Sequence, residues 1–142
     1  MAEQVARVVL VEDNPDHAEL VMAAIEDILS VEHVTHLTDG EAAIEYFRRC
    51  SEEHEARPDL ILLDLRLPKV DGIEVLRALK SDDALRSIPA VVLSSSDARR
   101  DIERAYENHA NSYIVKPLGF DSLQSLIGHI ITYWWRYNRS PA

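Results

Sequence analysis

Several short apolar runs of this sequence are followed at once by side chains that could do chemistry together. The residues concerned are Glu12, Asp13, Asp64, Ser94 and Lys116. If the runs are neighbouring parallel strands, three carboxylates, a hydroxyl and an ammonium meet at one edge of a sheet. Two carboxylates about 4 Å apart repel each other by about 4 kcal/mol at an effective dielectric constant of 20, so a positive partner must lie among them. An all-oxygen donor set of this kind indicates a site for a hard divalent ion, Mg²⁺ or Mn²⁺.

The same cluster is suited to a transient phosphoryl group. One carboxylate could act as the nucleophile, while the metal ion and Lys116 neutralise the phosphoryl oxygens and Ser94 donates a hydrogen bond. Asp64 is the best candidate nucleophile, because it ends the most apolar run and a reactive group works best on a rigid element. The acidic segment from Glu12 to Asp16 would repel a permanently bound phosphate, which argues against a flavin nucleotide site.

Five apolar runs predict the strands that position these residues. They are Val8 to Val11, Val31 to Leu37, Leu60 to Leu63, Ala90 to Leu93 and Tyr113 to Val115. All except the weaker second run are continuous rather than alternating, as in strands that are buried on both faces. Helical spacing separates the runs, so the β-α pattern repeats five times. This pattern predicts an α/β fold with a parallel sheet and helices on both faces.

Local signals mark where the helices should begin. Asn14-Pro15 supplies an N-cap followed by proline at the first helical position, and Asp39-Gly40 and Asp71-Gly72 supply turns before the next two helices. Asp97 is the candidate cap of the helix that runs to about His109, and Asp121 or Ser122 should start the last helix.

Length and composition narrow the classes of function. The chain has 142 residues, 46% of them hydrophobic and 28% charged, which predicts one ordered domain without room for a fused output domain. A net charge of −10 argues against nucleic acid as a partner. The 4 glycines lie too far apart for a dinucleotide fingerprint or a P-loop. The single cysteine, Cys50, excludes an internal disulfide and a multi-cysteine metal cluster.

Other features predict the location of the protein and exclude a second metal site. No apolar run approaches the roughly 20 residues that span a membrane, and the first residues lack the features of a signal peptide. We therefore expect a cytoplasmic protein with no membrane partner.

His33 and His36 lie on opposite faces of the weak second strand, without a third ligand nearby. We expect both histidines to be solvated.

The order and spacing of the candidate residues resemble those of response-regulator receiver domains in two-component signalling. Asp64 precedes Ser94 by 30 residues, Ser94 precedes Lys116 by 22, and Lys116-Pro117 and Leu67-Pro68-x-x-Asp71-Gly72 match family motifs. The resemblance covers essentially the whole chain. It implies a single receiver domain over residues 1–142, with the doubly wound, flavodoxin-like (βα)5 fold. Its five-stranded parallel sheet would have the strand order 2-1-3-4-5.

The resemblance also assigns roles at the site. Asp64 would accept a phosphoryl group from the phosphohistidine of a histidine kinase. Asp13 and Asp64 would bind Mg²⁺ directly, with the main-chain carbonyl of Arg66 as a third protein ligand, and Glu12 would act mainly through bound water.

Three further residues complete these implied roles. Lys116 would hold a phosphoryl oxygen, and Ser94 and Tyr113 would form the family's switch pair. The resemblance implies a signalling domain that catalyses only its own phosphorylation and dephosphorylation, rather than an enzyme with a separate substrate. Arg66 and Ser96 occupy positions that modulate hydrolysis in the family, but their spacing predicts no lifetime for the phosphoryl group.

A narrower likeness concerns the partner kinase. The segments Glu12 to Pro15 and His109 to Pro117, with the aromatic C-terminal helix, resemble small single-domain regulators that partner bacterial phytochrome histidine kinases. The likeness implies a bacteriophytochrome as the histidine kinase.

The expected last helix, from about Asp121 to Asn138, is long for the predicted sheet. At about 1.5 Å per residue it spans roughly 27 Å, whereas a five-residue strand spans about 17 Å. Its stripe of apolar residues includes Trp134 and Tyr137 but not Trp135. The final turns, with Tyr133, Trp134, Trp135 and Tyr137, should overhang the domain and meet a second subunit. The resemblance places such a homodimer on the fourth helix, fifth strand and fifth helix.

Two alternatives from other classes stay open. One is a phosphorylation-independent adaptor with the receiver fold, which has no need of all five site residues. The other is a Mg²⁺-dependent hydrolase of phosphorylated metabolites. A phosphatase of the haloacid dehalogenase type would carry its nucleophile in a D-x-D motif on the first strand, whereas this strand ends in Glu12-Asp13-Asn14.

Overall fold

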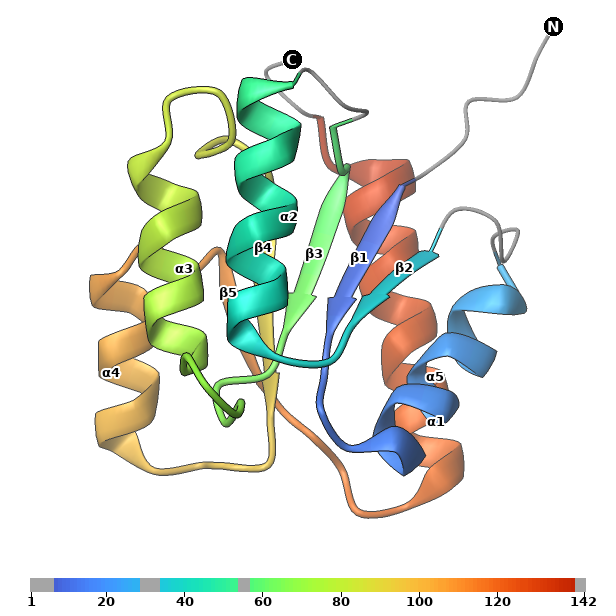
Figure 1. The fold of residues 1–142 in the computed structure, drawn as a ribbon. Helices are drawn as coiled ribbons and strands as arrows, with labels where there is room; N and C mark the ends of the chain where they lie inside the picture. Colours follow the sequence, from blue (N-terminus) through green and yellow to red (C-terminus); the bar gives the residue numbers. More distant parts are fainter. Residues whose placement is uncertain (1–6, 29–33, 54–56, 140–142) are drawn as a thin grey trace, which may run out of the picture.

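A parallel five-stranded sheet forms the centre of the computed structural model, which describes residues 7–28, 34–53 and 57–139. The strand order β2-β1-β3-β4-β5 is the predicted one (Figure 1). The strands are β1 (Val8–Val11), β2 (Val34–Leu37), β3 (Leu60–Leu63), β4 (Ala90–Ser94) and β5 (Ser112–Val115). The described part of the second apolar run is thus a strand, and residues 29–33, including His33, lie outside the described residues.

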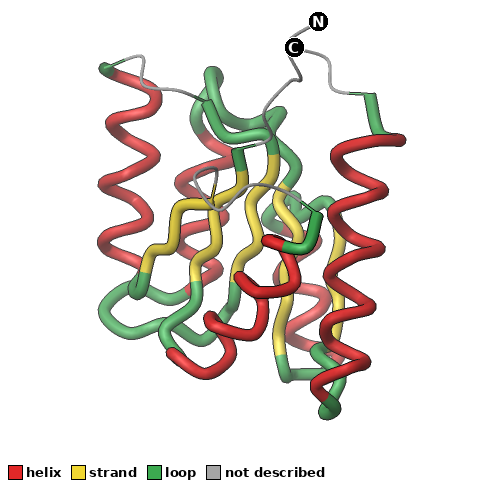
Figure 2. The backbone as a smooth tube through the Cα atoms, turned by 90° about the vertical axis from the view of Figure 1, so that its right-hand side faces the viewer, coloured by secondary structure: helices red, strands yellow, loops and turns green. Residues whose placement is uncertain are grey.

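Helices form a layer on each side of the sheet (Figures 1 and 2). They are α1 (Pro15–Glu26), α2 (Gly40–Glu52), α3 (Gly72–Ser81), α4 (Arg99–Glu107) and α5 (Phe120–Ile131), with a π-helical segment η2 (Thr132–Tyr137) after α5. One core cluster joins α1 and α5 to the sheet, and the other joins α2, α3 and α4. Among the described residues, no helix is long and apolar enough to cross a membrane.

The continuous apolar runs exist because both faces of the sheet are covered. In β1, Val9 and Val11 belong to the core beneath α2 and α3, whereas Val8 and Leu10 belong to the core beneath α1 and α5. All residues of β1, β3 and β4 are buried. Full burial of such a side chain stabilises the fold by about 1.5–3 kcal/mol, so these strands form a rigid base for residues at their ends.

Helix starts agree with the predictions for the first three helices. The Asn14 side chain accepts hydrogen bonds from the amides of Asp16 and His17, and the Asp39 and Asp71 side chains cap α2 and α3. The prediction is wrong for the last two helices. The N-caps of α4 and α5 are Ala98 and Gly119, and neither helix has a side-chain cap. The local signal fails for Asp97 because its side chain accepts no hydrogen bond from the first amides of α4, and α5 begins one residue before Asp121.

The loop between β3 and α3 passes close to two glycines. A Cβ atom at Gly72 would overlap the backbone of Asp64 and Leu65, and one at Gly40 would overlap the Val70 carbonyl. The Gly72 amide donates to the Leu65 carbonyl at 2.8 Å. Only glycine permits these approaches, which hold the loop after Asp64 against the starts of α2 and α3.

The C-terminal segment differs from the expected regular helix. In the π-helical turn the Asn138 amide donates to the Tyr133 carbonyl at 2.7 Å, an i→i+5 bond that widens the turn. As a result both Trp134 and Trp135 are half-buried against the core beneath α1 and α5. The expectation that all four aromatic residues lack support is therefore wrong for the tryptophans. Tyr133 and Tyr137 remain 52% and 72% exposed.

Candidate functional site

The predicted site residues meet at the carboxyl edge of the sheet. Backbone hydrogen bonds between neighbouring strands position them: the Asp64 amide donates to the Val11 carbonyl at 3.0 Å, and the Lys116 amide donates to the Ser94 carbonyl at 2.8 Å. Register therefore brings residues from four strand ends together. The structure gathers Glu12, Asp13, Asp64, Ser94 and Arg66 around one cavity of about 220 Å³.

Three carboxylates of this cavity could bind a metal ion. Glu12, Asp13 and Asp64 each offer a carboxylate oxygen, and these oxygens all lie within 4.8 Å of one another. Glu12 is buried, Asp64 is half-buried and Asp13 is exposed, so the set is open to solvent on one side. Hard divalent cations prefer such oxygen donors. The residues present fit Mg²⁺ or Mn²⁺.

The Lys116 ammonium lies among three acceptors. It donates to Glu12 Oε1, to Asp64 Oδ2 at 3.1 Å, and contacts His17 Nδ1 at 3.2 Å. The side chains of Lys116 and Glu12 are only 5% and 3% exposed. A buried ion pair of this kind costs about 3–5 kcal/mol to break by removing one partner, because the other charge stays buried.

Burial also affects the protonation of Glu12. Desolvation is the main reason that the pKa of Glu12 is raised from 4.5 to about 7; Lys116 opposes the rise, and the nearby Asp64 carboxylate adds to it. One lysine therefore does not neutralise the carboxylates of the site. A divalent cation would favour the ionised form of Glu12.

Asp64 is held by donors on both carboxylate oxygens. Oδ1 accepts from the Arg66 amide at 3.0 Å, and Oδ2 accepts from Lys116. The side chain is 12% exposed and follows directly after the buried strand β3. This geometry presents a fixed carboxylate to the cavity.

Ser94 and Tyr113 both contact the backbone of Ser96. Ser94 is fully buried, and its Oγ accepts from the Ser96 amide at 3.1 Å. The half-buried Tyr113 donates its hydroxyl proton to the Ser96 carbonyl at 2.7 Å. The two predicted switch residues are thus linked through Ser96, at the start of the loop that leads to α4.

The structure adds two residues that the sequence analysis did not assign to the site. His17, on the first turn of α1, lines the cavity and contacts Lys116. Its position four residues after Asp13, on a capped helix, is a signal that could have found it. His36 is half-buried, and its Nε2 lies 2.8 Å from the Glu12 carbonyl oxygen, so the expectation of a solvated side chain is wrong for His36. The pairing of β2 with β1 brings it there.

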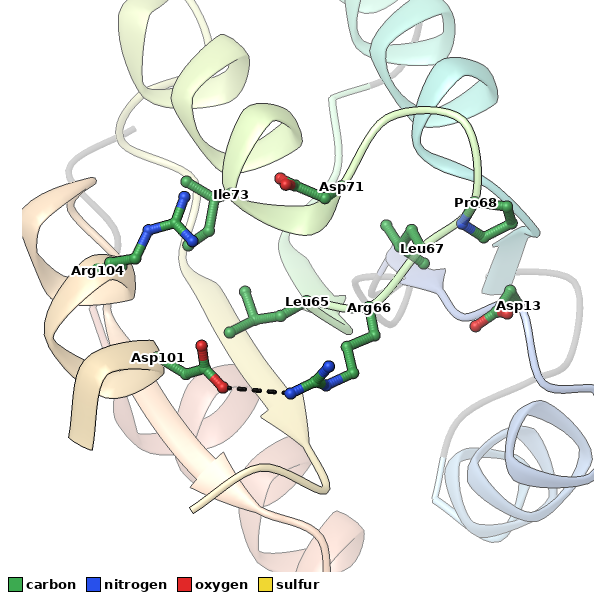
Figure 3. Close-up of a pocket in the computed structure, with 9 residues that line it drawn as sticks. All are labelled: Asp13, Leu65, Arg66, Leu67, Pro68, Asp71, Ile73, Asp101 and Arg104. Atoms are coloured by element: carbon green, nitrogen blue, oxygen red, sulfur yellow. Dashed lines mark ion pairs between the residues drawn. The ribbon is translucent and has the colours of Figure 1, made fainter. Parts of the chain in front are cut away.

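A second cavity, of about 400 Å³, lies between the β3–α3 loop and α4 (Figure 3). Arg66 and Asp101 line it and form an ion pair at 3.6 Å, which Figure 3 marks with a dashed line. Asp13 and Arg104 line the same cavity. No sequence signal connects Asp101 with Arg66.

Comparison of the sequence with known proteins gives matches over nearly the whole chain. A family model described as the response regulator receiver domain matches residues 8–128. The probable methanogenesis regulatory protein FilR2 of Methanothrix harundinacea is 46% identical over 140 residues, covering 99% of this chain and 90% of FilR2. Response regulator Rcp1 of Synechocystis sp. is 36% identical over 136 residues, covering 95% of this chain and 92% of Rcp1.

Solved structures show the same architecture. The phosphorylated cyanobacterial phytochrome response regulator RcpA superposes with a TM-score of 0.90 at 40% identity, covering 98% of this chain and 100% of that one. The Mn²⁺-bound form of Rcp1 superposes with a TM-score of 0.86 at 36% identity, covering 96% and 99% of the two chains.

Proposed function

The chain belongs to the response regulator receiver domain family of two-component signalling, and we propose that Asp64 accepts a phosphoryl group from the phosphohistidine of a histidine kinase. One observation carries the proposal: the Asp64 carboxylate is fixed at the end of β3 with Lys116 at 3.1 Å and two further carboxylates beside it. Carboxylates placed this close repel one another unless a cation lies between them, so their arrangement indicates a reactive site rather than ordinary surface charge.

In the proposed transfer, an Asp64 carboxylate oxygen attacks the phosphorus atom of the phosphohistidine. The oxygen–phosphorus bond forms as the nitrogen–phosphorus bond breaks, and the released imidazole takes up a proton from water. The Lys116 ammonium lies beside Asp64 Oδ2, where its charge would neutralise a phosphoryl oxygen. The domain would thereby catalyse its own phosphorylation and dephosphorylation only.

A metal ion is part of the proposed function. Asp13, Asp64 and the main-chain carbonyl of Arg66 would hold Mg²⁺ or Mn²⁺, and Glu12 would act mainly through bound water. Bound there, the cation would supply positive charge to the phosphoryl oxygens. The carboxylate geometry supports this assignment, and the relative Rcp1 is described in a Mn²⁺-bound form.

We propose that Ser94 and Tyr113 form the switch pair. The Ser94 hydroxyl would donate to a phosphoryl oxygen and give up its bond with the Ser96 amide. Because Tyr113 donates to the Ser96 carbonyl, movement of Ser96 would change the position of Tyr113. The signal would then leave through protein contacts at α4 and β5.

The proposed kinase partner is a bacteriophytochrome. Support comes from relatives named as phytochrome or bacteriophytochrome response regulators, namely RcpA, RtBRR and AtBRR. A purified bacteriophytochrome kinase is expected to label Asp64 faster than histidine kinases that lack a phytochrome sensor domain. Equal rates from all kinases would contradict this choice of partner.

We also propose a homodimer through α4, β5 and α5. Tyr133 and Tyr137 are exposed beside the half-buried Trp134 and Trp135, and exposed Tyr106 and Val115 lie on α4 and β5. Light scattering should give the mass of a dimer for the parent and of a monomer for Tyr133→Ser with Tyr137→Ser. These substitutions spare the tryptophans, which contribute to the core. A monomeric parent, with and without a phosphoryl mimic, would contradict the dimer.

Incubation with labelled acetyl phosphate and Mg²⁺ tests the main proposal. Asp64→Asn should abolish the label, because the amide cannot form the acyl phosphate. Asp97→Asn is the control, since it removes an exposed carboxylate on the nearby loop and should keep the label. Equal labelling of Asp64→Asn would exclude Asp64 as the acceptor. A parent that takes no label from acetyl phosphate or any kinase would favour the adaptor.

A further inference from the structure

A series of side-chain contacts joins the acceptor to α4. The Arg66 amide donates to Asp64 Oδ1 at 3.0 Å, and the guanidinium of the same residue forms its ion pair with Asp101 Oδ2 at 3.6 Å (Figure 3). Ser96 Oγ donates to the same Asp101 oxygen. Since Ser96 also contacts Ser94 and Tyr113, Asp101 lies between the acceptor loop and both proposed switch residues.

Arg66 lies on the boundary between two cavities. It lines the cavity of about 400 Å³ that contains Asp101, and it also lines the cavity of about 220 Å³ that contains Asp64 and Ser94. Its side chain is 77% exposed, so few packing contacts restrict it to one side. The guanidinium can therefore serve an anion in either cavity.

The present ion pair is weak enough to exchange. With the Arg66 side chain 77% exposed and the charged atoms 3.6 Å apart, the pair contributes about 0–1 kcal/mol. A phosphoryl group carries up to two negative charges, and arginine binds such groups with charge-assisted, often bidentate hydrogen bonds. A phosphoryl group on Asp64, two residues from Arg66, would be the stronger partner.

We propose that Asp101 is a positioning residue, which holds the Arg66 guanidinium beside α4 while Asp64 is unmodified and loses it to the phosphoryl group on Asp64. The proposal rests on the proposed function of Asp64. It adds a second connection from the acceptor to α4, through the Arg66 guanidinium, which meets the Ser94 and Tyr113 pair at Ser96. Loss of Arg66 would loosen the first turn of α4, which has no side-chain cap of its own.

A nearby pair shows why this contact differs from ordinary surface charge. Arg99 and Glu103 form an i,i+4 ion pair within α4, with side chains 92% and 55% exposed. Asp101, by contrast, is 26% exposed and is bound from two other segments, by Arg66 and by Ser96. The Arg99–Glu103 pair involves only α4. The Arg66–Asp101 pair connects α4 with the loop after Asp64, so a change at Asp64 can alter it.

Binding of beryllofluoride with Mg²⁺, a phosphoryl mimic on the carboxylate, tests the exchange by calorimetry. Asp101→Asn should tighten binding by about 2- to 5-fold because the competing carboxylate is lost. Arg66→Met should weaken binding by a similar factor, and Asp101→Asn added to Arg66→Met should then have little effect. Glu103→Gln is the control for general loss of negative charge on α4. Equal effects of Asp101→Asn with and without Arg66 would overturn the inference.

Hydrogen exchange at α4 tests the contact both without and with the mimic. The amides of Asp101 and Ile102 donate to the Ala98 carbonyl and report the first turn of α4. Arg66→Met and Asp101→Asn should both speed their exchange, whereas Glu103→Gln should not. In the parent, beryllofluoride should speed exchange at the same amides, and unchanged exchange would overturn the inference. A parent that binds no beryllofluoride would instead overturn the proposed function, and the inference with it.

Discussion

Two lysines at opposite ends of the sheet show how the same side chain serves different purposes. Lys116 follows β5 at the carboxyl edge and contacts the carboxylates of Glu12 and Asp64. Lys80, near the end of α3, instead donates to three uncharged acceptors, each at 2.9 Å. These are the carbonyls of Arg86 and Ile88 and the side-chain oxygen of Asn111.

The charge of the partners separates the two roles. An ammonium has three protons, and both lysines have three acceptors, so the number of contacts does not distinguish them. In the described part of the chain, no carboxylate pairs with Lys80, and burial lowers its pKa to about 8. Lys80 connects α3 to the segments that begin β4 and β5. Lys116 instead faces a cluster of carboxylates that one ammonium does not neutralise, as expected for a site that also binds a divalent cation.

Of the changes that compare the two lysines, removal of the Lys116 ammonium has the largest expected effect. Lys116→Met should slow uptake of label from acetyl phosphate by about 100-fold, because one donor to the developing phosphoryl charge is lost. Lys80→Met, the same change at the other end, should label at nearly the parent rate. Rates are measured by quenching timed samples. Similar losses in both variants would break the distinction between the two lysines.

At the amino end of the sheet, Lys80→Met should disturb the structure more than Lys116→Met does, because Lys80 contacts the segments that begin β4 and β5. It leaves the carbonyls of Arg86 and Ile88 without this donor, which should lower the free energy of unfolding by about 1–3 kcal/mol. Urea denaturation followed by circular dichroism measures this loss. Lys69→Met, which removes an exposed lysine, is the control and should change stability by less than about 0.5 kcal/mol. A fully stable Lys80→Met would show that its three contacts are dispensable.

The pH dependence of stability provides the smallest and most specific test. Because the pKa of Lys80 is about 8 in the folded chain and about 10.4 when unfolded, the unfolded state binds more protons between these values. The burial penalty is present below pH 8 and is relieved as the pH rises. After allowance for partial solvent exposure, the parent should gain about 1 kcal/mol relative to Lys80→Met between pH 7 and pH 10. A constant difference across this range would indicate that the three oxygen acceptors keep the pKa of Lys80 at its ordinary value.

Much of the fold follows from local patterns. The continuous runs Val8 to Val11 and Leu60 to Leu63 are strands with every residue buried, as their lack of alternation predicts. Asn14, Asp39 and Asp71 cap the helices that follow them. The predicted cap of α4 is wrong, because an aspartate near a helix start does not necessarily cap it, and α5 begins at Phe120, one residue before the predicted Asp121.

For the candidate site too, the sequence predicts part of the arrangement and the structure shows the rest. The sequence identifies Glu12, Asp13, Asp64 and Lys116, since residues that end parallel strands share one edge of the sheet. The position of His17 on the capped helix after Asp13 places it near the same edge, but its contact with Lys116 joins residues far apart in the chain and is visible only in the tertiary structure.

The sequence by itself thus determined the order of the elements, the sheet and the polar residues at its carboxyl edge, because these follow from periodicity and from local capping. Tertiary structure alone decided that Ser96 contacts both Ser94 and Tyr113, that Arg66 pairs with Asp101, and that Trp135 in the π-helical turn is half-buried against the core. The contacts of Tyr113 with Ser96 and of Arg66 with Asp101 join residues far apart in the chain, and the position of Trp135 depends on the pitch of one helical turn. Only Ser94 and Ser96 are close in sequence. Their distances are set by the packing of helices on the sheet, which no local pattern encodes.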